Sequence, residues 1–386
     1  MRKLVFIVMA CFAFAPTIGL AAQAPAVGWG YVANIDSNWT TLSVPSNIQH
    51  NSCVDSYWAG FRWRTLETAD GTYAWSATVD LFINRAIADG KTITIAIKPG
   101  SATPAWLYTE DPTAAFSSIA NANNADTTTC SAYTVNVPYN ATFLTKWNAM
   151  IAALKAHLDA TFPGTWQPVV KAIMVGGFAN QATIMALPYQ NAINGIGTGT
   201  VSCNGSAAQY QCCSQNDTAA WKAVGYTRLK VRNALLSIAA QYVASFGLNG
   251  PKLQLDLSPS NFPPIDDSGN IVSSGPNAQD TVMITDIQRD MVKNGYGQVV
   301  QMYNDGMGPT FAPPFIKQDA SLMPVGGQAA TSEDTLAQQA VSNLAWGVYQ
   351  YDSYGSNSTG LGNPANQGAV CAYHWIANNT KGRTAP

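Results

Sequence analysis

Short apolar runs alternate along this chain with longer stretches in which apolar residues recur every three or four positions. Runs of the first kind predict β-strands, and stretches of the second kind predict amphipathic helices. The pattern predicts strands over residues 28–35, 60–66, 92–98, 169–178, 252–258, 298–303 and 345–351. It predicts helices over residues 79–88, 141–160, 219–246, 280–293 and 333–343.

Strands that alternate with helices are typical of parallel βα units. No internal repeat or flexible linker divides the chain, so we expect one α/β domain of the (β/α)8 TIM-barrel type. Seven strands are predicted; the eighth is short, lies in a long loop or is absent, and residues 371–376 fit either a strand or a closing helix. The segments after residues 98, 178, 258 and 303 are long, and in a barrel the loops at the carboxyl ends of the strands carry the site.

The N-terminus has the features of a secretory signal. Two basic residues precede an apolar run over residues 4–20, and small residues follow it up to Ala22. This order predicts a signal peptide over residues 1–22, a mature barrel domain over residues 23–386, and a secreted, extracellular or periplasmic protein. Pro16 and Gly19 argue against a membrane anchor, and no later segment is apolar enough to span a membrane. A lipoprotein cleavage box over residues 8–11 is the alternative.

Export favours disulfides over free thiols. Six cysteines remain after removal of the signal, enough for three disulfides in the long loops with the pairing left open: Cys53, Cys130, Cys203, Cys212, Cys213 and Cys371. A metal site is the weaker interpretation, because the adjacent Cys212 and Cys213 lack C-x-x-C spacing and the three histidines are scattered. We expect no metal and no cofactor.

The composition narrows the class of partner. Only 11% of the residues are charged, the net charge is −2, and there is no basic stripe, which argues against a nucleic-acid partner. Eleven tryptophans and sixteen tyrosines form a surplus of aromatic residues that suits a surface for stacking on sugar rings. Carbohydrate is therefore the expected partner.

One string of residues carries a family resemblance. It consists of Arg64-Thr65-Leu66-Glu67, then Gly71, Tyr73, Trp75 and Asp80, then Gly90-Lys91, and finally Thr103-Pro104-Ala105-Trp106-Leu107. This string resembles the second and third βα units of clan A glycoside hydrolases, the superfamily of β-galactosidase-like and cellulase-like barrels. Thr68 stands where these proteins usually have proline. The resemblance implies a TIM barrel whose ancestry is related to sugars.

Several residues are candidates for binding sugar. Arg62 and Arg64 are two positions apart and would share one face of a strand, where buried charges need carboxylates or hydroxyls as partners. Amide side chains just past strand ends can both donate to and accept from sugar hydroxyls. The predicted substrate-binding residues are Arg64, Glu67, Trp106, Asn180 and Asn304. For Glu67, a structural pairing is the preferred alternative.

The catalytic groups of such an enzyme are missing from the matching stretches. The resemblance implies an acid/base glutamate after the fourth strand and a nucleophile glutamate after the seventh. The chain has only three glutamates, Glu67, Glu110 and Glu333. The matching stretches, 172–188 and 346–352, contain none, and the expected positions fall at Ile184 and Gly347. A catalytically degenerate barrel, a pseudoenzyme, is the first hypothesis.

Two other functions stay open. Aspartates near strand ends could act as displaced carboxylates in an active glycoside hydrolase, and the candidates are Asp256, Asp305 and Asp352. A structural or self-assembling protein of the cell exterior could also reuse the barrel, because fold does not settle function.

Overall fold

Eight parallel strands close into a barrel. The computed structural model describes residues 30–34, 42–44, 49–50, 56–118, 133–181, 184–188, 217–247, 250–257, 262–272, 276–307, 325–329 and 347–352. The ring order is β1-β14-β13-β12-β11-β8-β5-β2, and β1 pairs with both β14 and β2. The barrel strands are β1 (Gly30–Asn34), β2 (Ser56–Arg62), β5 (Thr92–Lys98), β8 (Val170–Met174), β11 (Lys252–Asp256), β12 (Val300–Met307), β13 (Val325–Ala329) and β14 (Gly347–Asp352).

Seven strands were located in the sequence and the eighth was left as short, hidden in a long loop or absent; the structure has it in the long segment after residue 303. The strand that the hydrophobic pattern missed is β13, which pairs in parallel with β12 and β14. Its Gly326 and Gly327 have low strand propensity and no side chain that would reveal alternation. The strand predicted over residues 345–351 as the seventh is β14, the eighth in chain order.

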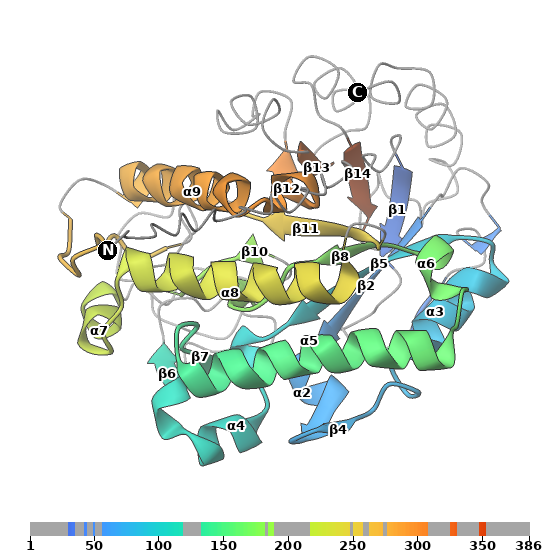
Figure 1. Cartoon of the computed structure of the whole chain (residues 1–386), viewed down its shortest axis with the longest axis horizontal. Coiled ribbons are helices and arrows are strands. Elements are labelled where there is room, and N and C mark those ends of the chain that lie inside the picture. Colours follow the sequence, from blue (N-terminus) through green and yellow to red (C-terminus); the bar gives the residue numbers. More distant parts are fainter. Residues whose placement is uncertain are drawn as a thin grey trace, which may run out of the picture.

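Long helices cover the outside of the barrel. In Figure 1, α5 (Ala141–Thr161), α8 (Arg228–Phe246) and α9 (Pro276–Lys293) lie side by side along one flank. The Asn140 side chain caps α5 by accepting from the backbone N–H of Phe143 at 2.9 Å. The Thr227 hydroxyl caps α8 in the same way, accepting from Lys230 N at 3.1 Å. The remaining helices are α2 (Trp63–Leu66), α3 (Val79–Ala88), α4 (Ala105–Glu110), α6 (Trp166–Val169), α7 (Thr218–Ala223) and the 3-10 turns η1 (Gly100–Ala102), η2 (Pro112–Ala114) and η3 (Tyr296–Gln298).

Two predicted elements differ in kind as well as in bounds from the structure. The helix predicted over 219–246 is two helices, because the chain turns between α7 and α8 at Gly225, whose φ is +77°. The strand predicted over 60–66 lies earlier, at β2, and the short helix α2 follows it. Predicted helix 333–343 and segment 371–376 lie outside the described residues.

Aromatic side chains join the barrel to α5. The Trp63 ring lies 5.1 Å from Trp147 and 5.8 Å from Phe143 in edge-to-face contacts. All three side chains are fully buried. Such pairs add roughly 0.5–1.5 kcal/mol each beyond the area they bury. Much of the tryptophan surplus seen in the sequence is therefore core.

Three small hairpins stand among the connections that follow β2, β5 and β8. They are β3 (Glu67–Ala69) with β4 (Thr72–Tyr73), β6 (Ala115–Ser118) with β7 (Tyr133–Asn136), and β9 (Ala179–Gln181) with β10 (Ile184–Met185). Each follows the carboxyl end of a barrel strand, so the hairpins belong to the end of the barrel that carries the site in this architecture.

His157 is a structural residue on the outer face of α5. Its Nε2 lies 2.7 Å from Asp80 Oδ1 in the first turn of α3, and its ring stacks on Trp75 at 5.6 Å. Two residues of the family-like string, Trp75 and Asp80, therefore tie α3 to α5.

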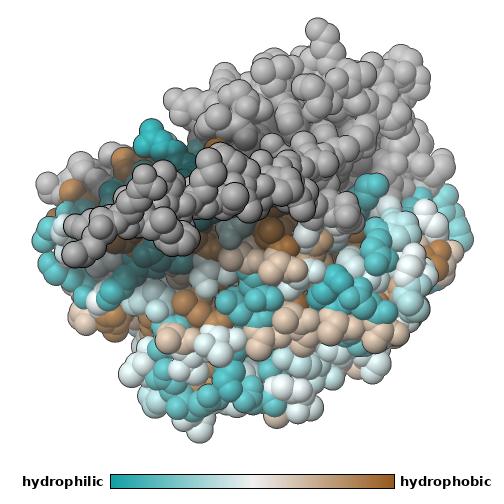
Figure 2. Space-filling model, in the orientation of Figure 1, coloured by the Kyte–Doolittle hydropathy of each residue, from teal (hydrophilic) through white to brown (hydrophobic). Residues whose placement is uncertain are grey.

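The visible surface is mixed in character. Figure 2 shows hydrophilic residues interspersed with apolar ones over the face that α5 and α8 form in Figure 1. Within the described ranges, no helix has the length and apolar character that a bilayer crossing requires.

Candidate functional site

Charged residues end four of the barrel strands, and for three of these the structure describes the side chain. Arg62 ends β2, Lys98 ends β5 and Asp256 ends β11. Arg62 and Lys98 are register partners on neighbouring strands, and β8 alone separates β5 from β11. Lys98 is 1% exposed and Asp256 is fully buried, whereas Arg62 is partly exposed. Because buried charges are costly unless they are paired, a polar layer at this end must be held by specific partners.

The barrel interior continues this polar layer inward. On β5, the apolar residues Ile93, Ile95 and Ile97 belong to the hydrophobic core, and Thr94 and Lys98 lie on the opposite face. Deeper in the barrel, Gln254 Nε2 donates to Gln301 Oε1 at 3.0 Å, and both amides are 2% exposed. Polar groups thus line the interior up to the strand ends.

The end of β8, the fourth barrel strand in chain order, has no room for a side chain. A Cβ on Gly176 would lie 2.5 Å from the backbone oxygen of Ile97, and one on Gly177 would lie 2.4 Å from Ile238 Cδ1. Phe178, the next residue, is 1% exposed. No carboxylate can therefore stand at either glycine without a shift of neighbouring atoms.

Asn136 joins the loops that follow β5 and β8. Its Oδ1 accepts from Gly100 N at 2.9 Å and from the Thr103 hydroxyl at 3.4 Å. Its Nδ2 donates to Gly177 O at 3.0 Å, and the side chain is 1% exposed. One buried amide at the end of β7 therefore fixes two strand ends relative to each other. The sequence analysis did not single it out.

Glu67 is a structural residue of the β3–β4 hairpin, as the preferred alternative held. Its carboxylate accepts from Trp63 Nε1 at 2.7 Å and from Gly71 N at 2.8 Å, and Tyr73 also bonds to it. Gly71 has a φ of +70°, which allows the tight turn of the hairpin. Burial raises the pKa of the Glu67 carboxyl above its ordinary value of 4.5, against the opposing effect of these hydrogen bonds.

The raised pKa of Glu67 makes a prediction about pH. The folded protein binds this proton more tightly than the unfolded chain, so the Glu67 contribution lowers stability as pH rises from about 4.5 through the raised pKa. We expect Glu67→Gln to flatten the decline in unfolding free energy between acid and neutral pH. Urea unfolding at several pH values measures it, with Glu110→Gln as the control because Glu110 is an exposed partner of Lys146. Equal slopes for the wild-type and Glu67→Gln proteins would contradict it.

Arg64 and Trp106 lie elsewhere than predicted. Arg64 is exposed on α2 and donates to Ser101 O at 2.9 Å, so it does not share a strand face with Arg62. Successive residues turn about 100° in a helix, whereas alternate residues share a face only in a strand. Trp106 lies on α4, donates to Glu67 O at 3.3 Å and has Lys146 of α5 5.8 Å from its ring centroid. These contacts fix the ring, which is partly exposed, so its contact with sugar stays a prediction.

For Asn180, Asn304, Asp305 and Asp352, the structure describes the backbone but not the side chain. Asn180 lies in β9 and Asn304 in β12, where Asn304 pairs with Gly327. Asp305 lies in β12, and Asp352 is the last residue of β14. The six mature cysteines all lie outside the described residues, so the three disulfides stay a prediction.

The strand order changes the position at which the resemblance implies a nucleophile. Gly347 is the first residue of β14, at the amino end of the eighth strand, and Ile184 lies in β10 rather than at the end of β8. The seventh strand in chain order is β13, which ends at Ala329. The chain after it includes Glu333, which lies outside the described residues. The position implied for the nucleophile is therefore near Glu333, not at Gly347.

A metal centre is not found in the described part of the chain. No group of three or more histidine, cysteine, aspartate or glutamate side chains there is arranged to hold an ion. The chemistry of this end rests on charged and amide groups alone as far as the described side chains go.

Comparison with known proteins supports the barrel. No protein-family model matches the sequence, and no characterised protein matches it in sequence. The β-galactosidase from Rahnella sp. R3 is similar in structure, with a TM-score of 0.52 and 12% identity over 95% of this chain and 58% of that one. The β-galactosidase from Bacillus circulans sp. alkalophilus gives 0.49 at 11% identity over 94% and 57% of the two chains. The catalytic domain of β-amylase from Paenibacillus polymyxa gives 0.47 at 10% identity over 84% and 92%.

These similarities concern the fold. At 12% identity, the first of them shows that the chain has the barrel found in a glycoside hydrolase, and it spans just over half of that protein. The resemblance seen in the sequence to clan A barrels is confirmed at that level.

Proposed function

We propose that the protein is an exported barrel of the glycoside-hydrolase-like fold that binds carbohydrate and does not cleave it efficiently. The observation that carries the proposal is the end of β8, where residues 172–188 contain no acid and the Ile97 carbonyl leaves no space for a side chain at Gly176, although such enzymes place an acid after the fourth strand. The secretory pattern over residues 1–22 supports export.

Cleavage requires two carboxylates at this end of the barrel. They stand about 5–5.5 Å apart in retaining enzymes and about 6.5–9.5 Å apart in inverting ones. Side chains are described at four strand ends, those of β2, β5, β8 and β11, and only Asp256 among them is a carboxylate. Full burial of Asp256 also keeps it from touching a substrate in this conformation.

Binding of a sugar requires hydrogen-bonding groups but no pair of carboxylates. Arg62 carries hydrogen-bond donors that can recognise hydroxyls, and the buried Lys98 and Asp256 end two other strands of the same barrel. Arg62 is the member of this layer that solvent reaches in part, so a ligand would meet it first. The fold similarity to a β-galactosidase is consistent with sugar as the ligand class.

The test is a binding screen with a site variant. We expect the wild-type protein to bind at least one oligosaccharide on a broad immobilised panel, with the affinity then measured by calorimetry. Arg62→Met should weaken that binding about 10- to 100-fold, because a hydrogen bond to a charged group contributes about 1.5–3 kcal/mol.

The matched control is Arg85→Met. Arg85 lies on α3 and pairs with Asp89 at 3.2 Å, away from the strand ends. It should bind within about twofold of wild type, since Arg85 touches none of the site residues. A panel without any ligand would contradict the proposal; equal binding by Arg62→Met and Arg85→Met would contradict the site.

A hydrolase with displaced carboxylates is the second candidate. Asp256 is the register partner of Tyr303 on β12, and Asp305 follows two residues later on the same strand. This closeness along two paired strands favours Asp256 and Asp305 over other pairs of aspartates. Hydrolysis assays separate this candidate from the first.

A further inference from the structure

A compact hairpin follows β11 at the rim of the barrel. We call residues 262–272 the rim hairpin. The Asp266 side chain organises it, with Oδ1 accepting from Ser268 N at 2.9 Å and from Asn270 N at 2.8 Å. Ile265 and Ile271 form a β-bridge across it. These bonds lie within the hairpin, so it keeps its shape whatever happens to its outer contacts.

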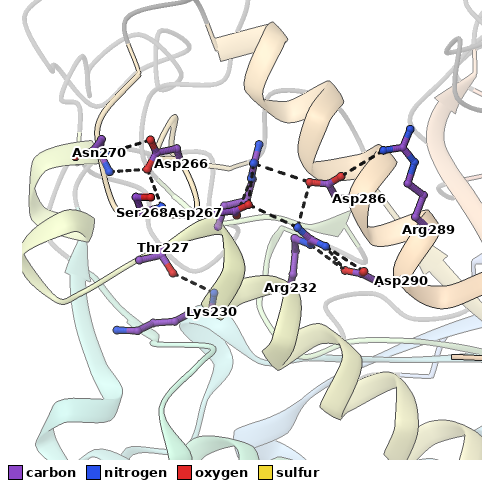
Figure 3. A network of polar contacts seen from close by, with 11 residues as sticks. Thr227, Lys230, Arg232, Asp266, Asp267, Ser268, Asn270, Asp286, Arg289 and Asp290 are labelled. Carbon is purple, nitrogen blue, oxygen red and sulfur yellow. Dashed lines mark hydrogen bonds and ion pairs between the residues drawn. The ribbon is translucent and has the colours of Figure 1, made fainter. Parts of the chain in front are cut away.

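Ion pairs attach the outer side of the rim hairpin to the helices. Arg228, the first residue of α8, makes a two-pronged contact with Asp267 at 2.9 and 3.0 Å. Figure 3 shows how this pair continues through Arg232 to Asp286 and Asp290 of α9. The Asp267 side chain is 40% exposed and that of Arg228 is 16% exposed, so solvent and salt reach the contact.

Apolar contacts attach the inner side of the rim hairpin to the barrel. Phe262 and Ile265 are 2% and 1% exposed. The Phe262 ring lies 6.2 Å from that of Phe178, which follows the end of β8, at an angle of 65°. The rim hairpin therefore connects the outer helices α8 and α9 to the chain at the end of β8.

We propose that the rim hairpin is a strap over the ends of β8 and β11, and that the Arg228–Asp267 ion pair, together with the hydrogen bond from Arg228 N to Asp266 O at 3.2 Å, holds it shut. The strap moves as a unit because its own hydrogen bonds survive when this pair breaks. Its opening separates Phe262 from Phe178 and loosens the chain that follows Asp256. A fully buried carboxylate at the strand end becomes accessible only when a covering segment moves, and the strap begins six residues after Asp256 in the chain.

Hydrogen exchange tests the strap without a ligand. In Asp267→Asn, the amides of residues 262–272 should exchange about fivefold faster, as expected for loss of a partly exposed ion pair worth roughly 1 kcal/mol. Amides of β11 and of α8 beyond its first turn should keep their rates. Raising the salt should speed exchange in the wild-type strap more than in Asp267→Asn. Asp159→Asn, which removes another exposed ion pair on α5, is the control.

The outcomes separate the strap from general loosening. Wild-type exchange rates in Asp267→Asn would overturn the proposal, and so would equal acceleration throughout β11 and α8. Arg228→Met removes the two-pronged contact but leaves Arg232 3.8 Å from Asp267, so it should speed exchange of the same amides by a smaller factor.

A role in ligand entry rests on the proposed function. If the binding screen yields an oligosaccharide, its association rate with Asp267→Asn should exceed the wild-type rate severalfold. An unchanged association rate would overturn that role. If no oligosaccharide binds, the proposed function fails, whereas the exchange result still decides whether the strap opens.

Discussion

Asn136→Ala should destabilise the protein by about 2–6 kcal/mol, because the change leaves two buried backbone groups without their partner at about 1–3 kcal/mol each. These groups are the N–H of Gly100 and the carbonyl of Gly177, which Asn136 bonds at 2.9 and 3.0 Å. The two groups belong to the loops after β5 and β8. The ends of these strands should therefore no longer be held in fixed positions relative to each other.

Urea unfolding and exchange measurements check this expectation. Asn84→Ala removes an exposed asparagine from α3 and should change stability by less than about 0.5 kcal/mol. Asn136→Asp keeps the acceptor oxygen for Gly100 but places a second oxygen against Gly177 O, so it should rescue only part of the loss. An Asn136→Ala protein with the wild-type unfolding midpoint would refute the role of this amide.

The sequence predicted elements well where one physical signal dominated. Helix α3 and strand β5 have the predicted bounds, because α3 has a clear helical stripe and five of the seven residues of β5 are β-branched. Strand β13 was missed since Gly326 and Gly327 suppress the strand signal, and pairing with two neighbours supplies what local propensity lacks. Tertiary contacts decide such segments.

The candidate site was less predictable than the fold. Residues were chosen by type and by nearness to strand ends, and this brought forward Asp256, which the structure buries at the end of β11. Trp106 fits the same description but packs against α5 instead. Asn136 gave no signal at all, because its role depends on loops from two distant parts of the chain. A miscounted strand also moved the expected nucleophile position from the chain after β13 to Gly347.

Natural oligosaccharides should not be hydrolysed above the rate in buffer. General acid catalysis contributes about 10²–10⁴ in rate, and the chain at the end of β8 has no acid over residues 172–188 and no space for a side chain at Gly176. The leaving oxygen of an oligosaccharide is a poor leaving group without protonation, so losing the acid should abolish turnover. The measurement is product formation by the unmodified protein on a broad panel of β-linked oligosaccharides.

Aryl glycosides separate the acid from the nucleophile. A dinitrophenyl group leaves with little need for protonation, so it reports on any carboxylate that can still attack or activate water. We expect no turnover of these compounds either. Turnover of dinitrophenyl glycosides alone, lost in Glu333→Gln, would reveal a surviving nucleophile after β13 in a barrel without its acid. Turnover of oligosaccharides that is lost in Asp256→Asn but kept in Asp159→Asn would overturn the degenerate barrel, because a displaced aspartate would then supply the proton that the end of β8 cannot.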